Sequence, residues 1–445
     1  MSFLRSRRPP FVWLLTKEWR ELLASRAWWV MLVLIGPLVG MSFVSAVRTY
    51  SELSGLNGTA AGVGEAFSPL IGVWAPTFSA LELAAAFLLP FVAIRVVAGD
   101  KQSGALKLEA QQPMSSFRRV AAKGLVLMVA WIIASIPAAI AIVLWRGYGG
   151  SVYPPELVAL VLGHVLNAGL TIALAAAAAS LTEHPSTAAI VTLSVTVGTW
   201  ILNFIAAVNG GVWQRAAEYT PTAMVAQFQH GLVRLDVTLA ALLATTGGFA
   251  IAAIWMRLGA HVARRAYESA IVMALASAAI LAVSFAGSSW DLSEGRINSL
   301  PEPDERALAR IHESLQMEVH FAPEDPRRTD LENKTLSKLR RAMPRLRITY
   351  VSATSTGLFE QTAAHYGEIF YDLGGRRTVN RLTSAEGVLE TIYSLAGIAA
   401  PTESDDAVFR GHPLAVPPRR AGVVFYGIWP AVIVAGALFH RRRLE

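Results

Sequence analysis

Long apolar stretches alternate with short polar connectors along most of this chain. Each stretch has about 20 mainly apolar residues, the length that an α-helix needs to cross the hydrocarbon core of a bilayer. They lie at residues 27–47, 79–98, 123–145, 157–181, 187–208, 237–258, 269–287 and 421–439. The pattern predicts an α-helical polytopic membrane protein with about eight transmembrane helices.

The segment 11–26, before the first span, has a different pattern. Its apolar residues recur at helical spacing: Phe11, Leu14, Leu15, Trp19, Leu22 and Leu23. Charged residues lie opposite them: Lys17, Glu18, Arg20 and Glu21. An amphipathic helix of this kind is expected to lie along the inner membrane surface and to lead into the first span.

The chain becomes polar and charge-balanced from Trp290 to about Arg420. Within this block, patterns typical of helices and strands alternate, which predicts a small α/β domain between the last two spans. The expected helices are near 302–315, 329–343 and 384–397, and the expected strands are 316–322, 345–353 and 367–373. Prolines in 399–420 predict a linker back to the membrane.

These patterns divide the chain into five parts. They are an interfacial helix at 1–26, a six-span domain at 27–258, a basic turn with span 7 at 259–289, the α/β domain with its linker at 290–420, and span 8 with a basic tail at 421–445.

Composition agrees with a membrane protein. Hydrophobic residues make up 53% of the 445 positions and charged residues only 16%, against about 25% charged residues in soluble proteins. The absence of cysteine excludes disulfides, thiolate metal sites and cysteine nucleophiles.

The net charge of +7 is unevenly distributed. With both termini inside, the outer connectors carry few cations: Arg48, Arg146, Arg215 and Arg234. The inner segments carry a clear excess, at the N-terminus, in 99–123, in 257–265 and at Arg441–Arg443. This bias fits the positive-inside rule and places 290–420 outside. The basic residues therefore indicate topology and lipid contact, not nucleic-acid binding.

The segment 99–123 is the most informative connector. It has a turn containing Gly104, an amphipathic stretch, then Pro113 and the start of a helix. This order is typical of a docking element for a cytoplasmic partner. Arg118 and Arg119 are expected either to anchor the topology or to contact an acidic surface of that partner.

Most of 11–258 resembles the ABC-2 type transporter permeases, specifically the gliding-motility-type permease. In 99–123 the resemblance lies in Asp100, Gly104, Leu106, Leu108, Pro113 and Lys123. Asp100 stands where the family usually has Glu, and Ala122 where it commonly has Gly. A second similar piece, 219–237, has Pro221, Phe228, Gly231 and Asp236 at the family's spacing. The resemblance implies short re-entrant helices there, on the outer face.

The polar block resembles another member of such systems. WDLSEGRINSLPEPDERALARI at 290–311 and YGEIFYDLGG at 366–375 are similar to the gliding-motility-type auxiliary subunit, which carries a large extracytoplasmic domain. This block is much shorter than that domain. The chain therefore looks like a permease fused to a shortened auxiliary subunit.

The resemblance implies the transmembrane subunit of an ATP-binding-cassette exporter in the bacterial cytoplasmic membrane. Separate ATPase subunits would bind ATP and magnesium, since the chain has no G-x-x-x-x-G-K-[ST] sequence. A second permease copy or paralogue and an envelope partner are also implied. The expected ATPase-coupling residues are Asp100, Lys101, Gly104, Leu106, Pro113, Arg118, Arg119 and Lys123.

Polar residues also occur inside the spans. Thr192, Thr196, Thr199 and Asn203 form one stripe on span 5, and His164 and Asn167 lie on one face of span 4. With Glu82 they are expected to line a translocation path or a subunit seam, or else to make ordinary interhelical hydrogen bonds. Arg95 shares span 2 with Glu82, too far along the helix for direct pairing.

Two other functions are compatible with parts of the sequence. A membrane scaffold would recruit an envelope partner through the α/β domain without transporting anything. An intramembrane enzyme would have only Glu82 and His164 to offer, and the histidine spacing does not favour a metal site.

Overall fold

A computed structural model describes residues 10–57, 67–109, 111–209, 211–322, 325–343, 345–351, 364–401 and 411–442. Contacts within the chain divide it into two compact units. Unit 1 comprises Met1–Leu202, Ala217–Trp290 and Arg410–Glu445, and unit 2 comprises Asn203–Ala216 and Asp291–Phe409. Residues 402–410 of the expected linker and 352–353 of an expected strand lie outside the described residues.

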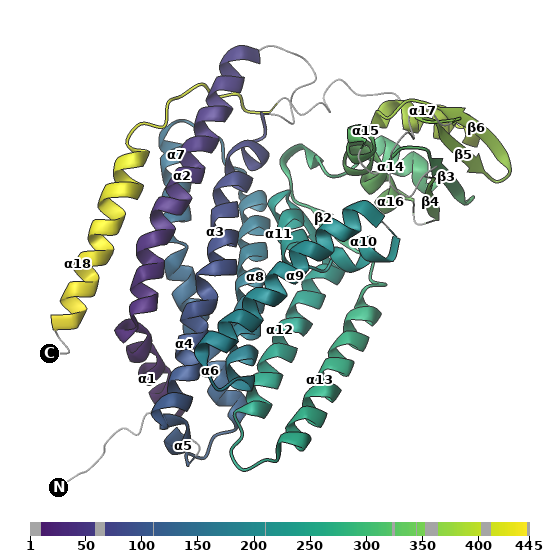
Figure 1. The fold of residues 1–445 in the computed structure, drawn as a ribbon. Coiled ribbons are helices and arrows are strands. Elements are labelled where there is room, and N and C mark those ends of the chain that lie inside the picture. The colour runs from purple at the N-terminus through teal and green to yellow at the C-terminus, as the bar shows by residue number, and fades with distance from the viewer. Residues whose placement is uncertain are drawn as a thin grey trace, which may run out of the picture. The chain divides into compact units, whose positions relative to one another are not determined.

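Unit 1 is a bundle of long apolar helices (Figure 1). The described residues contain eight helical stretches of membrane-spanning length and hydropathy, which confirms a polytopic helical membrane protein. They are Arg26–Gly55, Leu70–Ser103, Ser116–Gly147, Pro154–Leu181, Pro185–Ala206, Leu235–Trp255, Val262–Val283 and Val423–Arg442.

Several spans contain more than one helix. The elements up to Asp291 and after Phe409 are α1 (Pro10–Ala24), α2 (Arg26–Asn57), η2 (Leu70–Trp74), α3 (Ala75–Phe87), α4 (Leu89–Ser103), α5 (Ala105–Glu109), α6 (Ser116–Ala134), α7 (Ile136–Gly147), α8 (Pro154–Leu181), α9 (Pro185–Asn209), α10 (Gly211–Ala217), α11 (Pro221–Gln229), β1 (Leu232–Arg234), α12 (Leu235–Trp255), α13 (Val262–Val283), β2 (Ser289–Asp291), η7 (Val423–Ile428) and α18 (Trp429–Arg442). Of these, the end of α9 and most of α10 fall in unit 2.

Proline explains two of the helix breaks. The second span is interrupted at Leu88, two residues before Pro90, and the third at Ser135, two residues before Pro137. Proline has no N–H and its ring crowds the preceding turn, so a helix tends to end just before it. Pro37 remains inside the continuous helix α2.

The last span packs against the first through two glycines. A Cβ at Gly36 would lie 2.0 Å from Trp429 Cδ1, and one at Gly40 would lie 2.3 Å from Phe425 Cβ. The Trp429 indole also donates a hydrogen bond of 2.7 Å to the carbonyl of Leu32. Small residues four apart let membrane helices approach closely, so this notch positions α18 beside α2 (Figure 1).

Unit 2 contains a four-stranded sheet in the order β4-β3-β5-β6. Strand β3 pairs in parallel with β4 and antiparallel with β5, and β5 pairs antiparallel with β6. The elements are η3 (Glu294–Arg296), α14 (Glu302–Ala309), β3 (Leu315–Val319), α15 (Pro326–Leu331), η4 (Glu332–Leu336), α16 (Ser337–Ala342), β4 (Leu346–Tyr350), β5 (Ile369–Leu373), β6 (Arg376–Asn380) and α17 (Ala385–Ala396).

The core of unit 2 is built from every second residue of the two central strands, β3 and β5. Leu315, Met317 and Val319 of β3 are buried, and their register partners on β5 are buried as well. The intervening positions, such as Glu318, are more exposed. Two expectations were wrong: the first helix ends at Ala309, and a fourth strand, β6, follows the glycine turn after Leu373.

Candidate functional site: a buried ion network at the 99–123 segment

Helix α1 buries part of its charged face. Glu18 lies between Leu14 and Leu22 at four-residue spacing, and all three are buried. Glu18 is 0% exposed. Glu18 was expected from the sequence to lie opposite the apolar residues, and this was wrong, because Glu18 shares the buried face of Leu14 and Leu22 that packs against α4 and α6.

Lys17 of α1 reaches the end of the second span and the helix after it. Its ammonium group donates to Asp100 of α4 at 2.7 Å and forms an ion pair with Glu109 of α5. It also lies 3.2 Å from carboxylate oxygens of Glu18 and Glu21. One lysine thus connects three helices.

Lys123 of α6 connects the same carboxylates from the other side. Its ammonium group donates to Glu18 at 2.7 Å and forms an ion pair with Asp100. Lys123 is 1% exposed and Asp100 2%. We call Lys17, Glu18, Asp100, Glu109 and Lys123 the ion network.

Burial and neighbouring charges shift the pKa values of Glu18 and Lys17, the two members of the ion network on α1. Burial raises the pKa of Glu18, and the two lysines oppose that rise. For Lys17, burial favours the neutral form, but the surrounding carboxylates outweigh it and hold the pKa of the ammonium group above its ordinary value. Charges buried in this way compensate one another, so removing one leaves its partners buried without an opposite charge.

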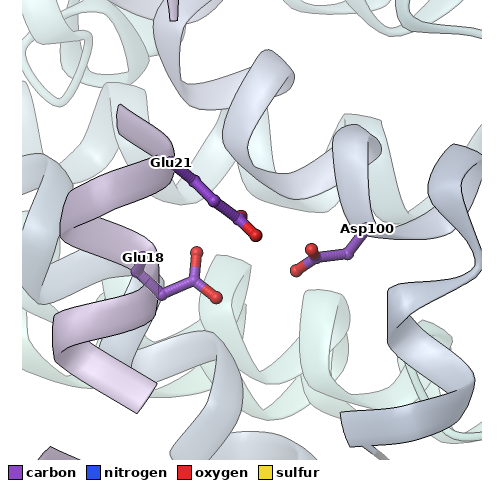
Figure 2. Close-up of side chains that lie close together, drawn as sticks. All are labelled: Glu18, Glu21 and Asp100. Carbon is purple, nitrogen blue, oxygen red and sulfur yellow. The ribbon is translucent and has the colours of Figure 1, made fainter. Parts of the chain in front are cut away.

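Three of the carboxylates converge closely enough to resemble a metal site. Oxygens of Glu18, Glu21 and Asp100 lie within 4.8 Å of one another, and Figure 2 shows the three side chains pointing together from two elements. However, Lys17 contacts all three carboxylates, and Lys123 contacts Glu18 and Asp100. The ammonium groups supply the positive charge, so the cluster fits an ion network better than a cation site.

The 99–123 segment has the expected order of elements. Helix α4 ends at Ser103 and is capped by Gly104, whose φ of 76° is the left-handed conformation that favours glycine. The short helix α5 follows, and Ser115 caps the start of α6 by accepting a hydrogen bond from the Arg118 N–H.

Several expected coupling residues point into the bundle. Lys101 donates to the carbonyls of Ala179, Ser180 and Thr182, and so satisfies the end of α8. Leu106 is 7% exposed and belongs to the main apolar core. Asp100 and Lys123 are likewise engaged in the ion network.

The structure differs most clearly from the sequence-based expectation at Arg119. The two adjacent arginines were expected to share one role, as topology anchors or as contacts to a partner, but Arg119 is 5% exposed whereas Arg118 is exposed. One helical step separates their directions by about 100°, so Arg119 turns inward as Lys123 does four residues later. Pro113, Lys107 and Leu108 are exposed, the last at 69%.

Some of the polar residues within the spans line one small cavity. Glu82, Asn167, Thr196 and Thr199 line it, together with Thr222 of α11 and neighbouring residues. Its volume is about 40 Å³, enough for one or two waters. The Thr222 hydroxyl is hydrogen-bonded to the Glu82 carboxylate and accepts a bond of 3.1 Å from Trp200.

The other stripe residues are placed differently. His164 is buried against Phe78, with ring centroids 5.4 Å apart, and lies 3.5 Å from the Gln229 amide. Thr192 is fully buried and donates to the Ala188 carbonyl of its own helix. Thr192, His164 and Asn203 do not line the cavity.

The segment 219–237 forms a short helix and a turn. Pro221 begins α11, Phe228 packs into the notch at Gly163 of α8, and Gly231 has a φ of 79°. Asp236 is buried and accepts hydrogen bonds from Arg234 and from the Tyr219 hydroxyl. Burial, followed by the nearby Asp236 carboxylate, raises the pKa of Tyr219 to about 12.

Comparison with known proteins adds no relative. No family model, curated protein or solved structure matches this chain.

Lys17, Glu18 and Glu109 were not expected from the sequence to be site residues. One signal for Glu18 was present, since it occupies the position between Leu14 and Leu22 on the apolar stripe of α1. Lys17 and Glu109 carried no such signal, because their partners are 83 and 92 residues away along the chain.

Proposed function

We propose that this chain is the transmembrane subunit of an ATP-binding-cassette exporter of the ABC-2 kind. The observation that carries the proposal is the ion network, which fastens α1 and α5 to the second and third spans. A force applied to these two short helices from outside the bundle would reach those spans through buried charge pairs. That is what an energy-coupling element requires.

The exposed part of the 99–123 segment supplies a surface for a partner. Lys107 and Arg118 are exposed cations, and Leu108 and Phe117 are exposed apolar residues at 69% and 48%. An apolar anchor surrounded by cations suits an ATPase surface with a small pocket and acidic rim. We define Lys107, Leu108, Phe117 and Arg118 as the docking surface.

The remaining parts follow the same proposal. The fifth span is only 11% buried within the chain, which leaves its surface for lipid or for a second permease copy. Both termini and the docking surface would be cytoplasmic, and unit 2 would lie outside as a contact module for an envelope partner. ATP and magnesium would bind to the partner, and the cavity at Glu82 would belong to the substrate path.

Charge reversal at Arg118 tests the proposal. The full chain is purified from native membrane with its bound partners, and ATP hydrolysis is measured on the complex. Arg118→Glu is expected to lose the ATPase and its activity while the chain keeps its melting temperature, because the side chain is exposed. Arg442→Glu, at another exposed arginine, is the control and should retain both.

The outcome also separates transporter from scaffold. A partner that depends on Arg118 but hydrolyses no ATP would favour a membrane scaffold. Equal ATPase recovery with Arg118→Glu and Arg442→Glu would contradict the docking surface.

A further inference from the structure

A second candidate site lies where α1 joins α2. An open cavity of about 650 Å³ is lined by residues from that junction, from α4 and from the start of α9. Its charged residues are Arg26 of α2 and Arg95 of α4. All of these residues belong to unit 1. The ion network and the docking surface include none of them.

The two arginines lack protein partners. Among the described residues, neither guanidinium makes an ion pair or a hydrogen bond. Both side chains are exposed, and Arg95 lies eight residues before the end of the second span at Ser103, where an arginine favours an anionic partner. Two unpaired guanidinium groups on one cavity therefore indicate an anionic ligand that is not part of the chain.

Two further features point to an anion. Ser25 is only 9% exposed, and its hydroxyl has no partner among the described residues. The first turn of α9 contributes Pro185 and Ser186 to the cavity. Pro185 has no N–H, so this turn offers the cavity the N–H of Ser186. Such first-turn N–H groups lack intrahelical acceptors and favour negative charge.

The rest of the cavity is apolar. Phe91 and Ile94 line it from α4, and Ala27 and Ala189 line it from α2 and α9. Phe91 is 48% exposed. A free phosphate ion would gain nothing from these side chains, whereas the acyl chain of a lipid would pack against them.

We infer that this cavity binds one anionic glycerophospholipid. Its phosphate lies between Arg26 and Arg95, and an acyl chain follows Phe91 and Ile94. The Ser25 hydroxyl, which is enclosed in this structure, turns into the cavity to donate to the phosphate. Basic pockets between transmembrane helices commonly hold such headgroups. Because Ser25 is the break between α1 and α2, the lipid would set the angle at which α1 leaves the first span. The inference requires a membrane protein but does not depend on transport.

Native mass spectrometry of the full chain in detergent tests this inference. Phosphatidylglycerol is titrated against phosphatidylcholine of the same acyl chains. The wild type is expected to bind one phosphatidylglycerol with a Kd about tenfold or more below that for phosphatidylcholine. Arg26→Gln combined with Arg95→Gln should abolish this preference. Lys107→Gln combined with Arg118→Gln removes the same charge elsewhere and should preserve it.

Milder variants keep the test decisive if the double variant does not fold. Ser25→Ala and Arg95→Lys should each weaken phosphatidylglycerol binding several-fold, by removing a donor or the bidentate fork. Equal binding of the two lipids by the wild type would overturn the inference. The inference would also be overturned if the cavity variants and the control variant lost phosphatidylglycerol binding to the same extent. Displacement of the lipid by excess inorganic phosphate would also overturn it, because the site would then recognise phosphate alone.

Discussion

Lys123 and Asp100 form an ion pair that is almost completely enclosed by the protein. Lys123 comes from the third span and Asp100 from the end of the second, and Glu18 accepts a second hydrogen bond from Lys123 at 2.7 Å. The pair therefore joins two spans and attaches the N-terminal helix to both. The proposed coupling mechanism depends on this connection.

Lys123→Met should strongly destabilise the protein, by about 3–5 kcal/mol, because it leaves Asp100 and Glu18 buried without one of their two cations. Thermal unfolding in detergent measures the effect. Lys107→Met, at an exposed lysine, is the control and should change stability by less than about 0.5 kcal/mol.

Adding Glu18→Met to Lys123→Met should recover part of that loss, since one buried anion is removed with the cation and Lys17 remains for Asp100. A double variant that is less stable than Lys123→Met alone would show that the two groups do not compensate each other.

Gly36→Ala should loosen α18 from α2, because the added Cβ would meet the Trp429 ring at 2.0 Å. The expected cost is about 1–3 kcal/mol. Trp429→Ala combined with Gly36→Ala should cost less than the sum of the two changes. Gly55→Ala is the control, since its Cβ would meet nothing within 4 Å, and replacing a helical glycine should stabilise slightly.

Asp325→Asn should destabilise unit 2 at neutral pH and lose its effect in acid. The Asp325 carboxylate accepts hydrogen bonds from Arg327 and Tyr366, and the Arg327 bonds in particular lower its pKa to about 2. A lowered pKa stabilises the fold above the ordinary value of 3.8, and this contribution disappears as pH falls towards 2.

Urea unfolding of residues 291–401 at pH 7 and near pH 2 measures that difference. We expect this fragment to fold alone, because its buried cluster runs from Leu300 to Tyr393. The free energy of unfolding of the wild type should exceed that of the variant by about 1 kcal/mol at pH 7. An equal difference at both pH values would contradict the role assigned to the ionised carboxylate.

Cysteine labelling tests the proposed topology, since the chain has no native cysteine. In intact cells, Ser337→Cys should react with a membrane-impermeant reagent, and Ser115→Cys should react only after permeabilisation. The reverse order would place unit 2 and the 99–123 segment on the opposite sides.

The sequence predicted the spans well because a membrane helix is a local feature of composition and length. It predicted less of what depends on distant partners. Arg119 reads as one of two equivalent cations until the rotation of α6 is known, and Lys17 finds Asp100 83 residues away. Strand β6 was missed because its sequence, RRTVN, is largely exposed at the edge of the sheet. The Gly36–Gly40 spacing was visible in the sequence, but its partner, α18, was not.

Site-specific photocrosslinking from helix α5 in native membranes tests the central claim most directly. A photoreactive residue replaces Leu108, which is 69% exposed, or Leu106, which is 7% exposed on the same helix. We expect the residue at position 108 to crosslink to a separate ATP-binding polypeptide and the residue at position 106 not to do so. No ATP-binding partner at Leu108, or the same crosslink from both positions, would contradict it.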